Sequence, residues 1–93
     1  MDDRGDTVEA EGRIARRARE DDHIRVTLLA EEGGEVVGTY RLAYAHADFW
    51  RLSGTLSAAA QRRWTVRLTV DPDSHLIRSV VFGRYLNFMN RQG

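Results

Sequence analysis

The densest group of candidate metal ligands in this sequence is the segment Asp71-Pro72-Asp73-Ser74-His75. Carboxylate oxygens and imidazole nitrogens bind metal ions well. The same residue types also suit a β-turn, because Asp and Ser form local hydrogen bonds with the backbone and Pro favours the second turn position. We interpret the segment as a turn, and we predict no metal site and no bound cofactor.

Nucleophilic catalysis would have to use hydroxyl groups, because the chain has no cysteine. The candidate nucleophiles and bases are Ser53, Ser57, Ser74, Ser79, His23, His46 and His75. A serine nucleophile needs a neighbouring base and an acid that orients that base. No recognisable motif assembles such a set, and Gly33-Gly34 lacks the Lys-Ser or Lys-Thr of a phosphate-binding loop. We therefore predict a protein that is not an enzyme and has no catalytic residues.

Arginine supplies all 14 of the basic residues, and lysine is absent. The arginine side chain binds phosphate and carboxylate groups through two parallel hydrogen bonds. The sequence pattern predicts a solvent-facing set of arginines on the strands, interleaved with threonines: Arg13, Arg25, Arg41, Arg63 and Arg67. Such a surface could follow a phosphate backbone. Arg25, Arg41 and Arg67 are therefore the candidate residues for binding single-stranded DNA or RNA.

Two features argue against nucleic acid as the main partner. The 14 acidic residues cancel the arginines to a formal net charge of zero, so there is no long-range attraction to a polyanion. Single-strand binders also stack bases on exposed aromatic rings, whereas Tyr40, Tyr44 and Trp64 are predicted on inward strand faces. Nucleic-acid binding is therefore the alternative function.

Aromatic residues outside the predicted strands favour a protein partner. Trp50 lies beside the apolar stripe of a predicted helix, and Tyr85 and Phe88 belong to an unusually apolar chain end. Exposed aromatic side chains are typical anchors of protein interfaces. The sequence thus predicts a binding module that acts through protein–protein interaction or self-association as a homo-oligomer. A small enzyme or metal-binding domain is the third alternative.

The elements that would position these residues follow from the spacing of apolar side chains. Alternation with a period of two predicts five strands, at 7–17, 23–30, 36–45, 63–70 and 76–82. Gly33-Gly34 predicts a hairpin turn with positive φ angles, and Gly12 predicts a bulge or bend within the first strand. Phe49, Leu52 and Leu56 have helical spacing, so residues 48–62 are predicted to be one helix capped by Asp48, or two short turns broken at Gly54.

The element order β-β-β-α-β-β leaves two architectures open. It resembles the oligonucleotide/oligosaccharide-binding (OB) fold, a small five-stranded barrel, in order and length over residues 7–82. The loops after the first and fourth strands, which usually bind the ligand of such a barrel, are acidic here. An open antiparallel α+β sheet with one packed helix is the alternative.

The 93 residues suit one domain. We expect a disordered acidic tail at 1–6 and a single small domain at 7–93, whose last residues either pack or bind. No apolar run approaches the length of a membrane span, and the acidic start does not resemble a secretory signal. Together with the absence of cysteine, these features predict a cytoplasmic protein with no membrane partner.

Overall fold

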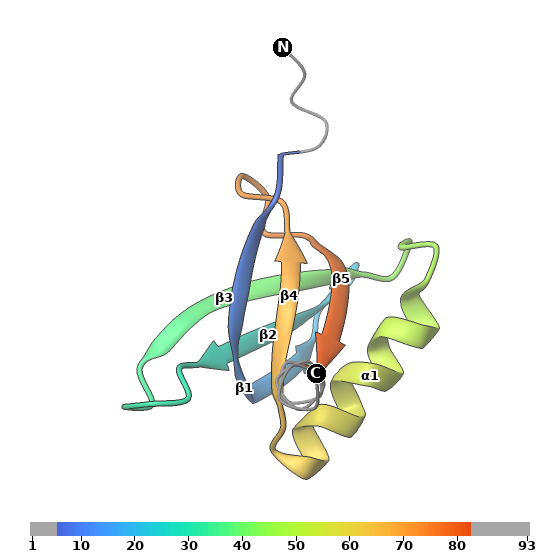
Figure 1. Cartoon of the computed structure of the whole chain (residues 1–93). Helices are drawn as coiled ribbons and strands as arrows, with labels where there is room; N and C mark the ends of the chain where they lie inside the picture. Colours follow the sequence, from blue (N-terminus) through green and yellow to red (C-terminus); the bar gives the residue numbers. More distant parts are fainter. Residues whose placement is uncertain (1–5, 83–93) are drawn as a thin grey trace, which may run out of the picture.

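The computed structural model describes residues 6–82. The elements of this part are β1 (Val8–Arg19), β2 (His23–Leu29), β3 (Val36–Ala43), α1 (Phe49–Arg62), β4 (Thr65–Val70) and β5 (Ile77–Phe82) (Figure 1). The strands form one antiparallel sheet in the order β3-β2-β1-β4-β5. The predicted element order is therefore confirmed.

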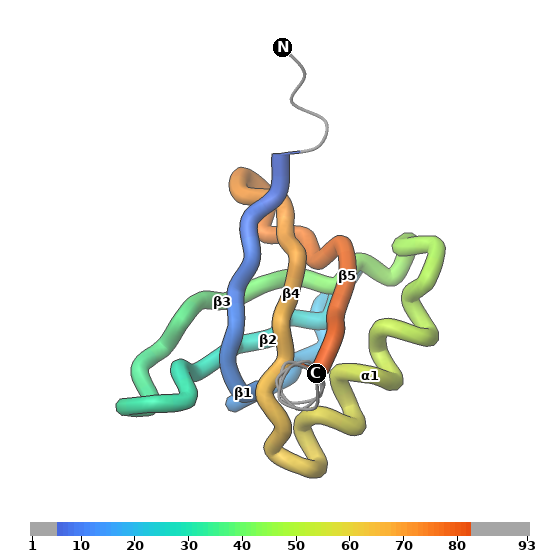
Figure 2. Tube along the Cα trace, viewed as in Figure 1, coloured from blue at the N-terminus to red at the C-terminus, as the bar shows by residue number. Residues whose placement is uncertain are grey.

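The two edge strands of this sheet approach each other without forming a ladder. Figure 2 shows β2 and β3 crossing behind β1 and β4. A single parallel bridge joins Arg41 of β3 to Leu76, and the Arg41 N–H donates to the His75 carbonyl at 2.9 Å. One bridge does not close a sheet, so the open-sheet alternative describes the structure and a closed barrel is not confirmed.

The core lies between the inner face of the sheet and α1. The most deeply buried side chains come from β2, β3, β4, β5 and the helix: Val26, Leu28, Leu42, Val66, Leu68, Val70, Ile77, Leu52 and Leu56. The period-two pattern of β2 and β4 correctly placed their apolar residues inward. Val36, which the alternation of the strand predicted at 36–45 places on the same inward face as Tyr40, is 65% exposed. A register shift beside Leu28 pairs Val36 with Leu29, so Val36 lies on the outer face.

Gly12 has a different role from the predicted bulge. The register shift in β1 falls between Ile14 and Arg16. At Gly12 itself, a Cβ atom would overlap the carbonyl oxygen of Leu29 and lie 3.1 Å from its carbonyl carbon. Gly12 is therefore required because the main chain of Leu29 passes directly over it.

The glycine-rich loop between β2 and β3 agrees with the prediction. Gly33 and Gly34 have φ angles of 89° and 67°, a region that side chains with a Cβ atom rarely adopt. The Ala30 N–H donates to the Glu35 carbonyl at 2.7 Å across the base of this loop. The two glycines thus let a short loop reverse the chain.

The helical segment forms one helix rather than two turns, and Gly54 lies within it at an exposed position. Asp48 occupies the N-cap position as predicted, but its side chain caps no backbone group and pairs instead with Arg51 at 2.9 Å. The ring of His46 accepts the Asp48 N–H through Nδ1 at 2.9 Å, and its Nε2 donates to the Arg78 carbonyl at 3.1 Å. His46 therefore joins the start of the helix to β5. No helix within residues 6–82 has the length and apolar character needed to cross a membrane.

Candidate interaction surface

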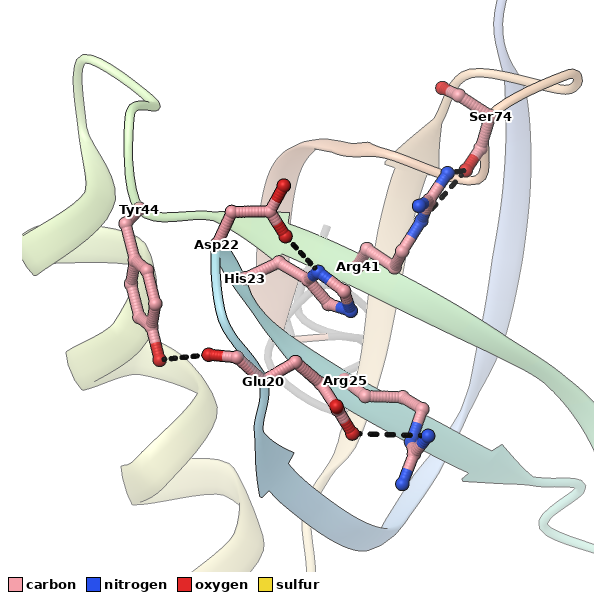
Figure 3. A network of polar contacts seen from close by, with 7 residues as sticks. All are labelled: Glu20, Asp22, His23, Arg25, Arg41, Tyr44 and Ser74. Atoms are coloured by element: carbon pink, nitrogen blue, oxygen red, sulfur yellow. Dashed lines mark hydrogen bonds and ion pairs between the residues drawn. The ribbon is translucent and has the colours of Figure 1, made fainter.

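Two of the candidate arginines lie side by side on the outer face of β2 and β3. Arg25 and Arg41 are directly opposed across the two strands, and like charges in that position repel. Each finds a compensating oxygen, as Figure 3 shows. Arg25 pairs with the Glu20 carboxylate at 3.1 Å, and Arg41 donates from Nε to the Ser74 carbonyl, also at 3.1 Å.

The loop between β1 and β2 contributes further negative charge to this face. The His23 ring donates to the Asp22 carboxylate at 2.7 Å, and this hydrogen bond lowers the pKa of Asp22. The Tyr44 hydroxyl donates to the Glu20 carbonyl at 3.2 Å, which ties the same loop to the segment after β3 (Figure 3). Arg25 and Arg41 are thus held within a local network that contains two carboxylates.

Arg67, the third candidate, lies apart from the other two. It is on β4, which β1 separates from β2, and its guanidinium lies 4.0 Å from the Glu9 carboxylate and 3.9 Å from that of Glu11. The predicted set of solvent-facing arginines therefore does not form a continuous positive surface, because the carboxylates of Glu9, Glu11 and Glu20 lie beside Arg67 and Arg25.

Neither of the two remaining arginines of that set is a fully exposed strand residue. Arg13 is half-buried. Arg63 precedes β4 and caps α1 in a left-handed conformation with a φ of 59°. The helix continues to Arg62 and uses Arg63 as its C-cap, so β4 begins later than the alternation suggested.

The loop between β4 and β5 uses its polar residues for backbone contacts. Asp71 Oδ1 accepts the N–H groups of Asp73 at 2.9 Å and Ser74 at 3.3 Å, and these hydrogen bonds lower the pKa of Asp71. The His75 ring binds the Thr39 carbonyl at 3.0 Å and packs against Tyr40. Over residues 6–82, no three His, Asp or Glu side chains come together in a way that could hold a metal ion.

Trp50 is the most exposed large apolar side chain of the described residues, at 84%. It lies in the first turn of α1, where it packs edge-to-face on Phe49 with ring centroids 5.1 Å apart. Phe49 also makes an edge contact with Tyr44, at 5.2 Å. The sequence pattern placed Tyr44 inward, but β3 ends at Ala43 and leaves Tyr44 38% exposed. The result is a group of three aromatic rings in which Trp50 and Tyr44 are exposed and Phe49, which contacts both, is buried.

A shallow hollow of about 360 Å³ adjoins these rings. Its lining comes from the end of β1, the start of β2, the segment after β3 and the first turn of α1: Arg19, Ile24, Tyr44, Phe49, Trp50 and Ser53. Ile24 and the rings make much of this lining apolar, while Arg19 adds a guanidinium and Ser53 a hydroxyl. We call this surface the Trp50 hollow.

The sequence indicated only part of this surface. Trp50 was identified by its place beside the helical stripe, but Arg19 lies beyond the end of the strand predicted at 7–17. In the structure β1 continues to Arg19 and carries it alongside the helix. A signal for this position was present in the sequence. Arg19 follows Arg17 by two residues, and residues two apart on a strand share a face. Tyr85 and Phe88, the other predicted interface residues, lie outside the described residues, as do residues 1–5 of the predicted acidic tail.

No protein-family model matches this chain, and searches of curated proteins and of solved structures find no match either. A function for this chain must therefore be inferred from its own geometry.

Proposed function

We propose that this protein is a non-enzymatic binding module that contacts another protein chain, either a second copy or a different protein, through the Trp50 hollow. The observation that carries the proposal is the 84% exposure of Trp50 beside two further rings. Tryptophan is enriched among the residues that dominate binding energy at protein interfaces. Exposed apolar groups that gather around a hollow favour a contact surface.

Two further points support a binding role over a catalytic one. Each histidine uses a ring nitrogen in a local contact: His23 with Asp22, His46 with main-chain groups of Asp48 and Arg78, and His75 with Thr39. These contacts orient the rings for structural purposes. The hollow itself is lined mainly by apolar groups, together with the Arg19 guanidinium and the hydroxyls of Tyr44 and Ser53, which suits recognition. We also propose a cytoplasmic location, on the ground that the chain has no cysteine.

Site-specific photocrosslinking in the cells that produce this protein tests the proposal. The photoreactive residue p-benzoylphenylalanine replaces Trp50 in one variant and Val36, which is 65% exposed on β3, in the control. We expect a covalent conjugate with a polypeptide from position 50 and none from position 36. The mass of the conjugate distinguishes a homodimer from a second protein. No conjugate at position 50, equal conjugates at both positions, or a conjugate that nuclease digests would refute the proposal.

Binding of single-stranded DNA or RNA is the second candidate function. It is favoured by the strand order and by the bridge between β3 and Leu76, just before β5, which would suit a partly open barrel of OB-like order. In such a barrel, Arg25 and Arg41 would lie beside the two loops that usually bind the nucleic acid. The carboxylates of Glu20, Asp22 and Asp71 in those loops weigh against it, so we place it second.

A salt titration separates this candidate from the first. A fluorescent single-stranded 12-mer is titrated at about 50 and 200 mM salt, where several phosphate contacts would weaken binding by orders of magnitude. Binding that falls steeply with salt and is lost in Arg41→Ala and Arg67→Ala would establish the second candidate. Absence of binding at the lower salt would remove it.

A further inference from the structure

The arginines of the sheet differ in whether a carboxylate lies within ion-pair distance of them. Arg25 and Arg67 have carboxylate partners, at 3.1 Å and about 4 Å. Within the described part of the chain, Arg17 and Arg19 form no ion pair, and both are exposed. Arg17 donates instead to the neutral hydroxyl of Ser57 on α1, at 2.6 Å. Two guanidinium groups that have no ion-pair partner among residues 6–82 therefore lie on the side of β1 that faces the helix.

The geometry of β1 and α1 aligns these arginines with Trp50. Arg17 and Arg19 pair with Val26 and Ile24, so both lie on the same face of the strand. Trp50, Ser53 and Ser57 follow at intervals of three and four residues, and therefore share one face of the helix. The Arg17–Ser57 hydrogen bond joins the two faces. The Trp50 hollow lies between the same strand and helix, with Arg19 of β1 and Trp50 of α1 in its lining.

This arrangement combines an apolar contact area with one accessible guanidinium. An aliphatic or aromatic side chain of a ligand could pack against Trp50, Phe49 and Ile24 in the hollow. The Arg19 guanidinium at the edge suits a carboxylate, which it can bind through two hydrogen bonds. A ligand that satisfies both parts carries an apolar group and a negative charge a few ångströms apart.

Acidic groups near the hollow distinguish between two kinds of anionic ligand. Glu20 and Asp21 directly follow Arg19, and Asp48 precedes the helix, where it already pairs with Arg51. A chain of phosphates that crossed this surface would meet these carboxylates. A peptide with a single carboxylate needs only Arg19 and can direct the rest of its chain elsewhere. The local charges therefore favour a peptide over a nucleic acid.

We propose that the Trp50 hollow binds an acidic–hydrophobic segment of a partner protein, with an apolar side chain packed on Trp50 and a neighbouring Asp or Glu on Arg19. The proposal rests on the function proposed above and specifies the chemistry of the partner. It assigns an interaction role to Arg19, while Arg17 holds β1 against the helix through Ser57.

Selection from a random library tests this specificity even though the natural partner is unidentified. The wild-type chain is used to select from an mRNA-display library of random 12-residue peptides, with counter-selection on Trp50→Ala. The enriched peptides are then labelled with fluorescein and titrated by anisotropy at about 150 mM salt, where the screening length of about 8 Å suppresses distant charge effects. We expect enriched sequences in which an apolar residue lies within a few positions of Asp or Glu.

Variants of the protein test separately the apolar contact with Trp50 and the ionic contact with Arg19. Trp50→Ala should weaken binding at least about 30-fold, the effect of losing an interface anchor. Arg19→Glu should weaken it at least about tenfold, because a charge-assisted hydrogen bond becomes a repulsion. Arg16→Glu is the matched control: it makes the same charge change on the opposite face of β1, where Arg16 pairs with Thr27. It should weaken binding less than about threefold, and circular dichroism checks that all variants fold.

The outcomes separate this inference from the function on which it rests. Library peptides that lack acidic residues, no enrichment over Trp50→Ala, or equal losses for Arg19→Glu and Arg16→Glu would overturn the inference. If the crosslink at position 50 still forms, the binding function survives and only the partner chemistry is wrong. If that crosslink also fails, both proposals are wrong.

Discussion

Two glycine-to-alanine substitutions should change the stability of this protein in opposite directions. Gly12 lies under the main chain of Leu29, so the added methyl group of Gly12→Ala would collide with the Leu29 carbonyl. Gly54 lies at an exposed position in α1, and beyond the adjoining helix backbone no heavy atom lies within 4 Å of the place its Cβ would take. The chemical change is identical, and only the surroundings differ.

The magnitudes follow from these surroundings. At Gly12 the obstacle is backbone rather than the end of a flexible side chain, so β1 and β2 must move apart where they are hydrogen-bonded. Overpacking of this kind costs about 1–3 kcal/mol. Since alanine also lowers the entropy of the unfolded chain, by about 0.4–1 kcal/mol in favour of folding, we expect a net loss of about 1–2 kcal/mol. At Gly54 the helix gains about 1 kcal/mol from the better helix former.

Thermal and urea denaturation followed by circular dichroism measure both effects. For a domain of this size, 1 kcal/mol corresponds to about 4–8 °C in Tm. Gly12→Ala should therefore melt about 4–16 °C below the wild type, and Gly54→Ala about 4–8 °C above it. A Gly12→Ala variant as stable as the wild type would refute the close approach of Leu29. A loss of stability in Gly54→Ala would refute the continuous helix.

Further predictions concern the core, the β4–β5 loop and the outer face of β2. Leu52→Ala removes a side chain that is 1% exposed, so the free energy of unfolding in urea should fall by about 2–5 kcal/mol; a fall below about 1 kcal/mol would contradict its place in the core. Asp71 has a folded-state pKa below its usual value of 3.8, because the N–H groups of Asp73 and Ser74 donate to it. Its stabilising effect is therefore present above pH 3.8 and is lost as the pH falls through the lowered pKa. Asp71→Asn should flatten this acid-side loss in a pH series of melting curves, and an unchanged acid limb would show that the loop does not hold the ionised carboxylate. Glu20→Gln removes the half-buried partner of Arg25 and should change the free energy of unfolding by less than about 1 kcal/mol. A larger change in urea titrations would mean that the pair organises the loop between β1 and β2.

Much of the fold could be predicted because it depends on local patterns. Alternation in β2 and β4 identified the inward residues Val26, Leu28, Val66 and Leu68, since side chains on a strand alternate between two faces. The errors occur where register or capping intervenes. Val36 lies outward because of a register shift that depends on how β3 pairs with β2. Such a shift is a property of two strands together, and neither strand's own sequence displays it.

The candidate site shows the same division. Trp50 could be identified because it lies beside the apolar stripe of α1. Arg19 could not, because its relation to Trp50 depends on the extension of β1 along the helix. Arg25 and Arg41 were correctly placed outward on neighbouring strands. The partner of Arg25 is the carboxylate of Glu20 in the loop before β2, and the partner of Arg41 is the carbonyl of Ser74 in the loop between β4 and β5. The alternation of residues along a strand does not reveal either contact.

The amino-acid pattern is enough to predict the element order and the inward faces of the regular strands, and it fixes the balance of 14 arginines against 14 acidic residues. Which of those charges lie close together depends on how the strands and the helix pack in three dimensions. This packing places Glu9 and Glu11 beside Arg67 and Glu20 beside Arg25, but gives Arg19 an apolar neighbour in Trp50. The physical reason is that Coulomb interactions depend on distances of a few ångströms, and those distances arise from the pairing of strands and the packing of the helix.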